Sequence, residues 1–380
     1  NTDTKPAPPR MVYCPPLNLD SAPLRLLLPY CFCLAFFYCD IDSQASEAVN
    51  AETQTLTIAL SQEPPQLDST KTTDQVSGFI LGHLMEGLVR YDKRGNIIPG
   101  VAEKWEMNKN SATFWLREDA MWSNGERVTA HDFVFAWQRV VDPKTASEYA
   151  FIFAPIKNAT EINEGSKLVS ELGVTALDDR TLQVELQRPT AFFMKLAVFV
   201  TFFPIQENFF KSRAGKYAAE AEDLIYNGPF KLTKWIHSAS LKMVKNDYYW
   251  DRKSVSLNAI NVEYITADTR SRLNLYADNK IAYTRLDGDT YQDALSQRFK
   301  IRRFNTGATF FLEYNHRTGR PTQNLNLRKA IQHIFDPDEM VNRVLATPGN
   351  LRGESLFPVW IEGVNGKFRK EYPAPLAEYS

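Results

Sequence analysis

The cysteines of this chain are confined to its N-terminal end. All four, Cys14, Cys31, Cys33 and Cys39, precede residue 40, and none follows it. A disulfide framework would spread them through the fold, and a zinc site would pair them with nearby histidines. The first histidine is His83, so neither device can organise the chain after residue 40. That part must fold on its buried apolar surface.

An apolar stretch, Leu26–Cys39, contains three of these cysteines and follows Arg25. Its 14 residues are too few to span a bilayer, which needs roughly 20. A positive residue, a short apolar run and then small polar residues are typical of a secretory signal. We expect residues 1–48 to be an N-terminal extension with a signal that is cleaved between residues 42 and 48. The expected product is exported and periplasmic.

Two other interpretations of this stretch stay open. A lipid on Cys39 would tether the protein to a membrane, although the bulky Phe36-Phe37-Tyr38 precede it where such a motif needs small residues. A buried core helix is the other, and Pro29 would interrupt it.

The length and charge of the chain bound its class. Its 380 residues, 44% of them hydrophobic, are too many for one compact core and predict two lobes or more. The 44 Lys and Arg residues are matched by 45 Asp and Glu residues. A nucleic-acid-binding protein needs a basic surplus or a basic stripe, so nucleic acid is not an expected partner.

Hydrophobic periodicity predicts alternating strands and helices with long connections, which is a mixed α+β fold. Thr129 with Asp132 three residues later predicts a capped helix start, and Asp142-Pro143 predicts its end. The predicted strands are 55–60, 112–118, a hairpin of 173–176 and 181–186, and strand-rich regions at 230–244 and 260–264. The predicted helices are 75–89, the capped helix through Val140, 191–200, and 327–344 with a break at Asp336-Pro337.

Several motifs in this order resemble one known family. They include GVAEKW at 100–105, TFWLREDAMWSNG at 113–125, VTAHDF at 128–133, NGPF at 227–230 and NDYYW at 246–250. The chain from about residue 52 onwards resembles the peptide-binding class, family 5, of the extracellular solute-binding proteins that serve ABC importers. The resemblance implies a two-lobed, periplasmic-binding-protein-like fold with an extra N-terminal subdomain. It also implies a receptor without enzymatic activity or a cofactor.

The resemblance implies a domain organisation as well. Family members run well past residue 380, so we expect the chain to be truncated at its C-terminus, with an incomplete second lobe and weakened peptide binding. The residues that pair with the amino terminus of a peptide would lie beyond the chain. The expected parts are the extension 1–48, the first part of lobe I at 49–85, an additional subdomain at 86–208, the continuation of lobe I at 209–308, and the start of lobe II at 309–380.

Candidate ligand contacts follow from the same resemblance. A receptor for peptides of varied sequence must hold the main chain that all peptides share. The family places such contacts at Thr73-Asp74-Gln75, where Thr73 replaces an acidic residue. Tyr149 matches a family tyrosine, although Glu148 replaces the usual proline. Its alternative role is that of an ordinary buried tyrosine.

Two further candidates lie in the stretch 310–315, which we expect to be a strand entering the second lobe. Glu313 matches a pocket glutamate of the family, and Phe311 is a weaker candidate for the pocket wall. The alternative for Glu313 is a carboxylate at a solvated strand edge. For Trp105, Trp115, Trp122 and Trp137 we expect packing roles.

A secreted hydrolase is the competing class of protein. The sequence contains no G-x-S-x-G, H-E-x-x-H, P-loop or dinucleotide motif, and its five histidines never fall at metal-ligand spacing. We therefore expect neither catalytic residues nor a metal site. A third possibility keeps the fold but binds a metal chelate, haem or a sugar. The expected partners are short peptides and the permease and ATPase subunits of an importer, with the receptor itself a monomer.

Overall fold

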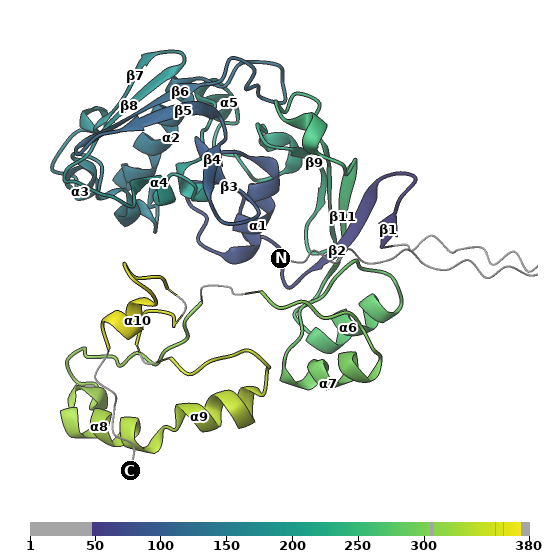
Figure 1. The fold of residues 1–380 in the computed structure, drawn as a ribbon. Coiled ribbons are helices and arrows are strands. Elements are labelled where there is room, and N and C mark those ends of the chain that lie inside the picture. The colour runs from purple at the N-terminus through teal and green to yellow at the C-terminus, as the bar shows by residue number, and fades with distance from the viewer. Residues whose placement is uncertain (1–47, 305–307, 354, 360, 374–380) are drawn as a thin grey trace, which may run out of the picture. The chain divides into compact units, whose positions relative to one another are not determined.

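The computed structural model describes residues 48–304, 308–353, 355–359 and 361–373 (Figure 1). The predicted secretory signal, its alternatives and all four cysteines lie outside these ranges. Within them, two main sheets and a small two-stranded one alternate with mostly short helices, so the mixed α+β class is confirmed.

The largest sheet joins the beginning of the described chain to a segment much further along it. Its five strands lie in the order β1-β2-β11-β10-β9. β2 and β11 run parallel, with Leu56 opposite Ile260, and the other neighbours are antiparallel. Parallel neighbours require a long crossover, and here the second sheet lies within it. The strands are β1 (Val49–Asn50), β2 (Thr55–Leu60), β9 (Phe230–Ile236), β10 (Ser240–Lys245) and β11 (Ala259–Ile265).

The second sheet is antiparallel, with four strands in the order β5-β6-β8-β7. Along β6, Ala112, Phe114 and Leu116 are fully buried, while the residues between them are partly exposed. This alternation of period two confirms the predicted strand. The strands are β5 (Ala102–Met107), β6 (Ser111–Leu116), β7 (Val174–Asp178) and β8 (Thr181–Glu185), and a separate pair is formed by β3 (Val89–Tyr91) and β4 (Ile97–Pro99).

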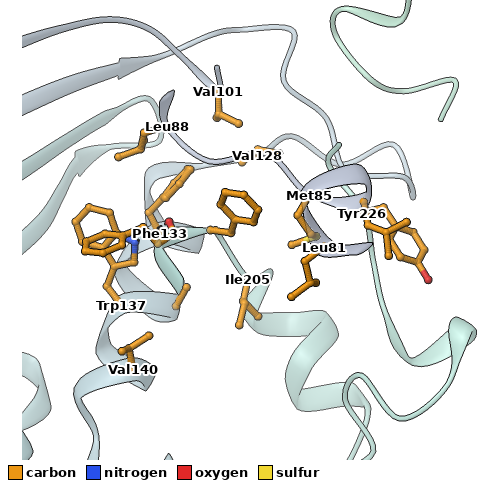
Figure 2. Close-up of a cluster of buried hydrophobic side chains, with 14 of the residues drawn as sticks. Leu81, Met85, Leu88, Val101, Val128, Phe133, Trp137, Val140, Ile205 and Tyr226 are labelled. Carbon is orange, nitrogen blue, oxygen red and sulfur yellow. Dashed lines mark hydrogen bonds between the residues drawn. The ribbon is translucent and has the colours of Figure 1, made fainter. Parts of the chain in front are cut away.

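The helix α2 (Ala130–Val141) begins and ends where the sequence predicts. Asp132 Oδ2 accepts a hydrogen bond from the backbone N–H of Thr129 at 2.8 Å, which satisfies a donor at the helix start. The face of α2 that bears Phe133, Trp137 and Val140 is fully buried. Figure 2 shows these side chains in the same hydrophobic cluster as Leu81 of α1 (Gln75–Leu84).

The remaining helical elements are short. The α-helices are α3 (Ala159–Asn163), α4 (Phe193–Leu196), α5 (Glu207–Ser212), α6 (Thr269–Ala277), α7 (Gly288–Ser296), α8 (Leu325–Ile334), α9 (Pro337–Glu339) and α10 (Phe368–Glu371). The 3-10 helices are η1 (Pro143–Thr145), η2 (Ala150–Phe153), η3 (Val169–Glu171), η4 (Val200–Phe202), η5 (Ala221–Asp223), η6 (Arg252–Ser254) and η7 (Pro321–Gln323), and η8 (Met340–Leu345) is a π-helix. The break predicted at Asp336-Pro337 separates α8 from α9.

The predicted helix 75–89 is too long, because α1 ends at Leu84. The side chain of Asn227 holds the backbone of Glu86 in an extended pairing. Asn227 Oδ1 accepts from Glu86 N at 3.0 Å, and Nδ2 donates to Glu86 O at 2.9 Å. The backbone N–H of Glu86 is therefore not available to extend the helix.

Glycine serves two different purposes in this fold. Gly125 follows Asn124 in a turn and has a φ of +86°. Gly228 lies against the backbone of Leu84, where an added Cβ would approach within 2.6 Å. It is needed there for close approach and not for a positive φ.

Two other predicted elements differ from the structure. The predicted helix 191–200 is reduced to α4, because the following chain turns inward so that Phe202 O accepts from Trp137 Nε1 at 3.0 Å. The predicted strand 310–315 is wrong as well. None of the described residues pairs with it, and a strand without a hydrogen-bonded neighbour does not persist.

The four tryptophans for which we expect packing roles differ in their burial. Trp122 and Trp137 are fully buried, which confirms their packing role. Trp105 is partly buried against the core, and Trp115 is partly exposed with Lys104 Nζ 4.6 Å from its ring centroid.

Candidate functional site

The loop between β2 and α1 is folded around the carboxylate and carbonyl groups of Asp68. Asp68 Oδ1 accepts from Thr70 N and Oγ1 at 3.0 and 2.7 Å, and Asp68 O accepts from Thr72 N at 3.0 Å. From α2, Arg139 Nη2 donates to Asp68 Oδ2 at 2.6 Å. These contacts set the course of the chain into residues 73–75.

Thr73-Asp74-Gln75 form the transition from this loop into α1. Asp74 is the N-cap, and its Oδ1 accepts from Ser77 N at 2.8 Å. Its carboxylate is therefore used within the helix start. The backbone N–H groups of Thr73, Asp74 and Gln75 have no acceptor among the described residues. Three adjacent donors are thus free to bind carbonyl or carboxylate oxygens of a ligand.

Tyr149 lies beside this segment. Its hydroxyl donates to Thr73 O at 3.3 Å, and the side chain is half-buried. The structure thereby brings together two of the predicted sites that are far apart in the sequence. Tyr149 is therefore not a fully buried core residue. Its ring packs edge-on against the rings of Phe151 and Phe199.

Phe311 and Glu313 are not joined to these residues. Both are exposed, and no hydrogen bond, ion pair or ring contact links either of them to 73–75 or Tyr149 within the described ranges. Their role as ligand contacts stays a prediction. Arg328 donates from Nη1 to the carbonyl oxygens of Thr322 and Gln323.

A pocket of about 250 Å³ lies on the loop that leads to this segment. It brings together polar and aromatic side chains from three separate stretches of the chain. It is lined by Pro65, Gln66, Asp68, Lys71, Tyr217, Ala218, Ala219, Trp235 and His237. This pocket could not be predicted from the sequence, because its lining comes from residues 65–71, 217–219 and 235–237, which are far apart along the chain.

Beside the pocket, Glu63 holds the hairpin between β9 and β10. Its Oε1 lies 2.6 Å from His237 Nδ1 and accepts from Trp235 Nε1 at 3.0 Å, and its Oε2 accepts from Ser238 N at 2.7 Å. The hydrogen bond with Glu63 raises the pKa of His237 above its ordinary value of 6.5. Glu220, 3.4 Å from His237 Nε2, adds to the same effect.

Two negative findings apply to the residues that the structure describes. None of their helices combines the length and the apolar character needed to cross a membrane. Nor do three or more His, Cys, Asp or Glu side chains in those ranges gather in a way that could hold a metal ion.

The motifs and the mixed fold agree with one family. Residues 96–378 match the profile of the bacterial extracellular solute-binding proteins, family 5 middle region. The chain belongs to this family, whose members are solute-binding proteins and not enzymes.

Named relatives support the same assignment. The chain is 34% identical over 284 residues to the dipeptide-binding protein DppE of Bacillus subtilis, covering 74% of this chain and 52% of DppE. It is 33% identical over 341 residues to the periplasmic murein peptide-binding protein MppA of Escherichia coli, covering 88% and 62%. It thus spans about half to three fifths of the length of these relatives.

Solved structures have the same fold. Listeria monocytogenes OppA bound to peptide matches with a TM-score of 0.79 at 36% identity, covering 86% of this chain and 65% of that one. The substrate-binding domain of an oligopeptide ABC transporter from Bacillus anthracis matches with a TM-score of 0.78 at 40% identity, covering 84% and 63%. The predicted periplasmic-binding-protein-like fold is confirmed by these matches.

Proposed function

We propose that this protein is the substrate-binding component of an ABC importer, which captures oligopeptides through their main chain and delivers them to a membrane permease. The observation that carries the proposal is the row of backbone N–H groups at Thr73, Asp74 and Gln75, which have no acceptor within the part of the chain that the structure describes. Every peptide offers carbonyl oxygens at regular spacing, so these donors would bind peptides of unrelated sequence. The names of the relatives, which refer to dipeptides, oligopeptides and murein peptides, support the same ligand class.

A ligand panel tests the proposal against its alternatives. Calorimetric titration with tri- to pentapeptides of unrelated sequence should detect binding, and a sugar, a metal chelate and haem should give none. Binding of one of these three without peptide binding would favour the non-peptide alternative. Mass spectrometry of the recovered peptides tests the secreted-hydrolase alternative, since a receptor returns them intact.

The main-chain mode has its own test. Replacing one amide of a bound peptide with an ester largely keeps its shape, but it weakens the carbonyl acceptor and removes the N–H donor of that bond. We expect a loss of about fivefold at the position that faces residues 73–75, corresponding to about 1 kcal/mol. Equal affinity of every ester and its parent amide would contradict this mode of binding.

We further propose the domain organisation given above, with lobe I formed by 49–85 and 209–308 and the subdomain 86–208 inserted in it. The five-stranded sheet supports this division, because its strands come only from 49–60 and 230–265. The second sheet, from 102–185, supports a separate subdomain. Residues 309–380, with Phe311 and Glu313, would begin the second lobe and contribute contacts from its side.

The remaining proposals concern export and assembly. We propose a monomer that is exported after cleavage between residues 42 and 48 and that docks on a permease and its ATPase. N-terminal sequencing of protein from the periplasm would test the cleavage. A retained Leu26–Cys39 stretch, or a lipid on Cys39, would contradict the soluble form.

A further inference from the structure

Three aromatic rings lie in a row beside the segment 73–75. The ring centroid of Tyr149 is 5.9 Å from that of Phe151 and 5.4 Å from that of Phe199, and both pairs are edge-on. The hydroxyl of the central ring donates to Thr73 O at 3.3 Å. The row therefore adjoins the free backbone donors of the candidate peptide site.

The two outer rings are unusually exposed for phenylalanines. Phe151 is 69% exposed and Phe199 is 41% exposed. None of the cation–π contacts among the described residues involves either of them or Tyr149. A cluster of rings that remains accessible in this way marks an interaction site more often than a scattered surface residue does.

A rigid inner layer supports this row. Phe153, in the same 3-10 helix η2 as Phe151, and Phe202, at the end of η4, are fully buried. Their rings stack with centroids 4.1 Å apart and an interplanar angle of 7°. Phe199, the N-cap of η4, and Phe151 are therefore presented outwards from elements whose inward rings are fixed by packing.

We propose that Phe151, Tyr149 and Phe199 form an apolar subsite that receives one aliphatic or aromatic side chain of a peptide bound along Thr73–Gln75. The protein would then favour peptides with such a residue at one position. This inference rests on the proposed peptide-binding function, and it adds a side-chain preference to a site that otherwise holds only the main chain. The occupant is a peptide side chain, because the row is hydrogen-bonded to the segment that offers donors to a peptide.

The test is a scan of alanine tri-, tetra- and pentapeptides in which a single Phe or a single Ser is placed at each position in turn. Affinities are measured by calorimetry for the parent protein and for Phe151→Ala and Phe199→Ala. The matched control is Phe192→Ala, because Phe192 is also exposed, at 54%, but makes no ring contact with the row among the described residues. Thermal melting without peptide verifies that each variant is folded.

In the parent protein, we expect Phe to be favoured over Ser by about tenfold at one position, as the burial of an aromatic side chain implies. In Phe151→Ala and Phe199→Ala, the preference for the Phe peptide over the Ser peptide should fall to about threefold or less at that position, because part of the apolar wall is lost. Phe192→Ala should keep the ratio of the parent protein.

Three outcomes would overturn the inference. Peptide binding without a Phe preference, or with a preference that Phe151→Ala and Phe199→Ala leave intact, would refute the subsite and leave the proposed function standing. If Phe151→Ala and Phe199→Ala lost the same affinity for every peptide, the rings would serve packing against another part of the protein or a second copy, and not a side-chain subsite. No binding of any peptide by the folded parent protein would refute the proposed function and the subsite together.

Discussion

Arg139 and Asp68 form an ion pair, with Nη2 and Oδ2 2.6 Å apart, that ties α2 to the loop preceding the candidate site. Only 16% of the Arg139 side chain and 10% of the Asp68 side chain are exposed. The same guanidinium donates to Thr70 Oγ1 at 3.0 Å and lies 4.0 Å from the ring centroid of Phe210. The pair thus holds the loop from which Thr73 emerges.

Replacing Arg139 with Met should destabilise the protein. The change leaves the Asp68 carboxylate buried without its counter-charge, which typically costs about 3 kcal/mol in the free energy of unfolding. Urea denaturation followed by circular dichroism measures the loss. In the double variant Arg139→Met with Asp68→Asn no uncompensated charge remains, so the loss should be smaller than the sum of the two single losses. Additive losses would show that the two residues do not stabilise one another.

Tyr149→Ala should weaken peptide binding by roughly 1–3 kcal/mol, because it removes a ring and a hydrogen-bonding group from the site. Tyr149→Phe keeps the ring and should lose about 1 kcal/mol or less. Thermal stability without peptide should change little, because the side chain is only half-buried. Unchanged affinity with a large drop in melting temperature would mean that Tyr149 serves the core instead.

Asp132 should make the stability of the protein depend on pH. Burial raises the pKa of its carboxyl group from 3.8 to about 6 in the folded state. The folded protein therefore binds more protons than the unfolded chain between about pH 4 and pH 6, and its stability falls as the pH rises through that window. Over the whole window, the free energy of unfolding falls by about 3 kcal/mol from this group.

Asp132→Asn tests this pH dependence. An amide oxygen still accepts from Thr129 N and Trp122 Nε1 but does not titrate in this range. The stability of the variant relative to the parent should rise between pH 4 and pH 7, as measured by urea denaturation at each pH. The same exchange at Asp119, whose side chain is 65% exposed, is the surface control. A stability difference between Asp132→Asn and the parent that stays constant from pH 4 to pH 7 would refute the prediction.

The pKa of His237 should lie above the ordinary histidine value, because its ring forms a hydrogen bond with the Glu63 carboxylate. Glu63→Gln should lower that pKa towards 6.5, and NMR titration of the imidazole protons measures the change. Since the folded pKa is raised, the pair stabilises the protein below the unfolded pKa, and this stabilisation is lost as the pH rises through the folded pKa. An unchanged titration of His237 in Glu63→Gln would show that the contact is not formed in solution.

Local signals in the sequence account for much of the fold. The capping residues Thr129 and Asp132 lie three residues apart, and the stop at Asp142-Pro143 involves neighbours, so both ends of α2 could be predicted. The strands β2 and β6 and the hairpin of β7 and β8 follow from short apolar patterns bounded by turns. The ordered motifs indicated the family, and the role of Tyr149 and residues 73–75 as ligand contacts, which the same resemblance implies, stays a prediction.

Pairings between distant residues could not be predicted in this way. The end of α1 is decided by Asn227, which lies 141 residues away from Glu86 in the sequence. The loop before the site is held by Arg139, 71 residues from Asp68. Nothing near Glu86 or Asp68 in the sequence specifies these partners, because a hydrogen bond between remote residues forms only once the sheets and helices that carry them have packed.

The sequence by itself therefore determined the class of protein, the position of most strands and the helix α2, because these depend on residues a few positions apart. Only the tertiary structure decided which phenylalanines face inwards. Phe151 and Phe153 lie in the same short helix, yet one is 69% exposed and the other is fully buried. The buried ring stacks against Phe202, whereas the exposed ring has a single ring contact among the described residues, with Tyr149 beside the segment 73–75.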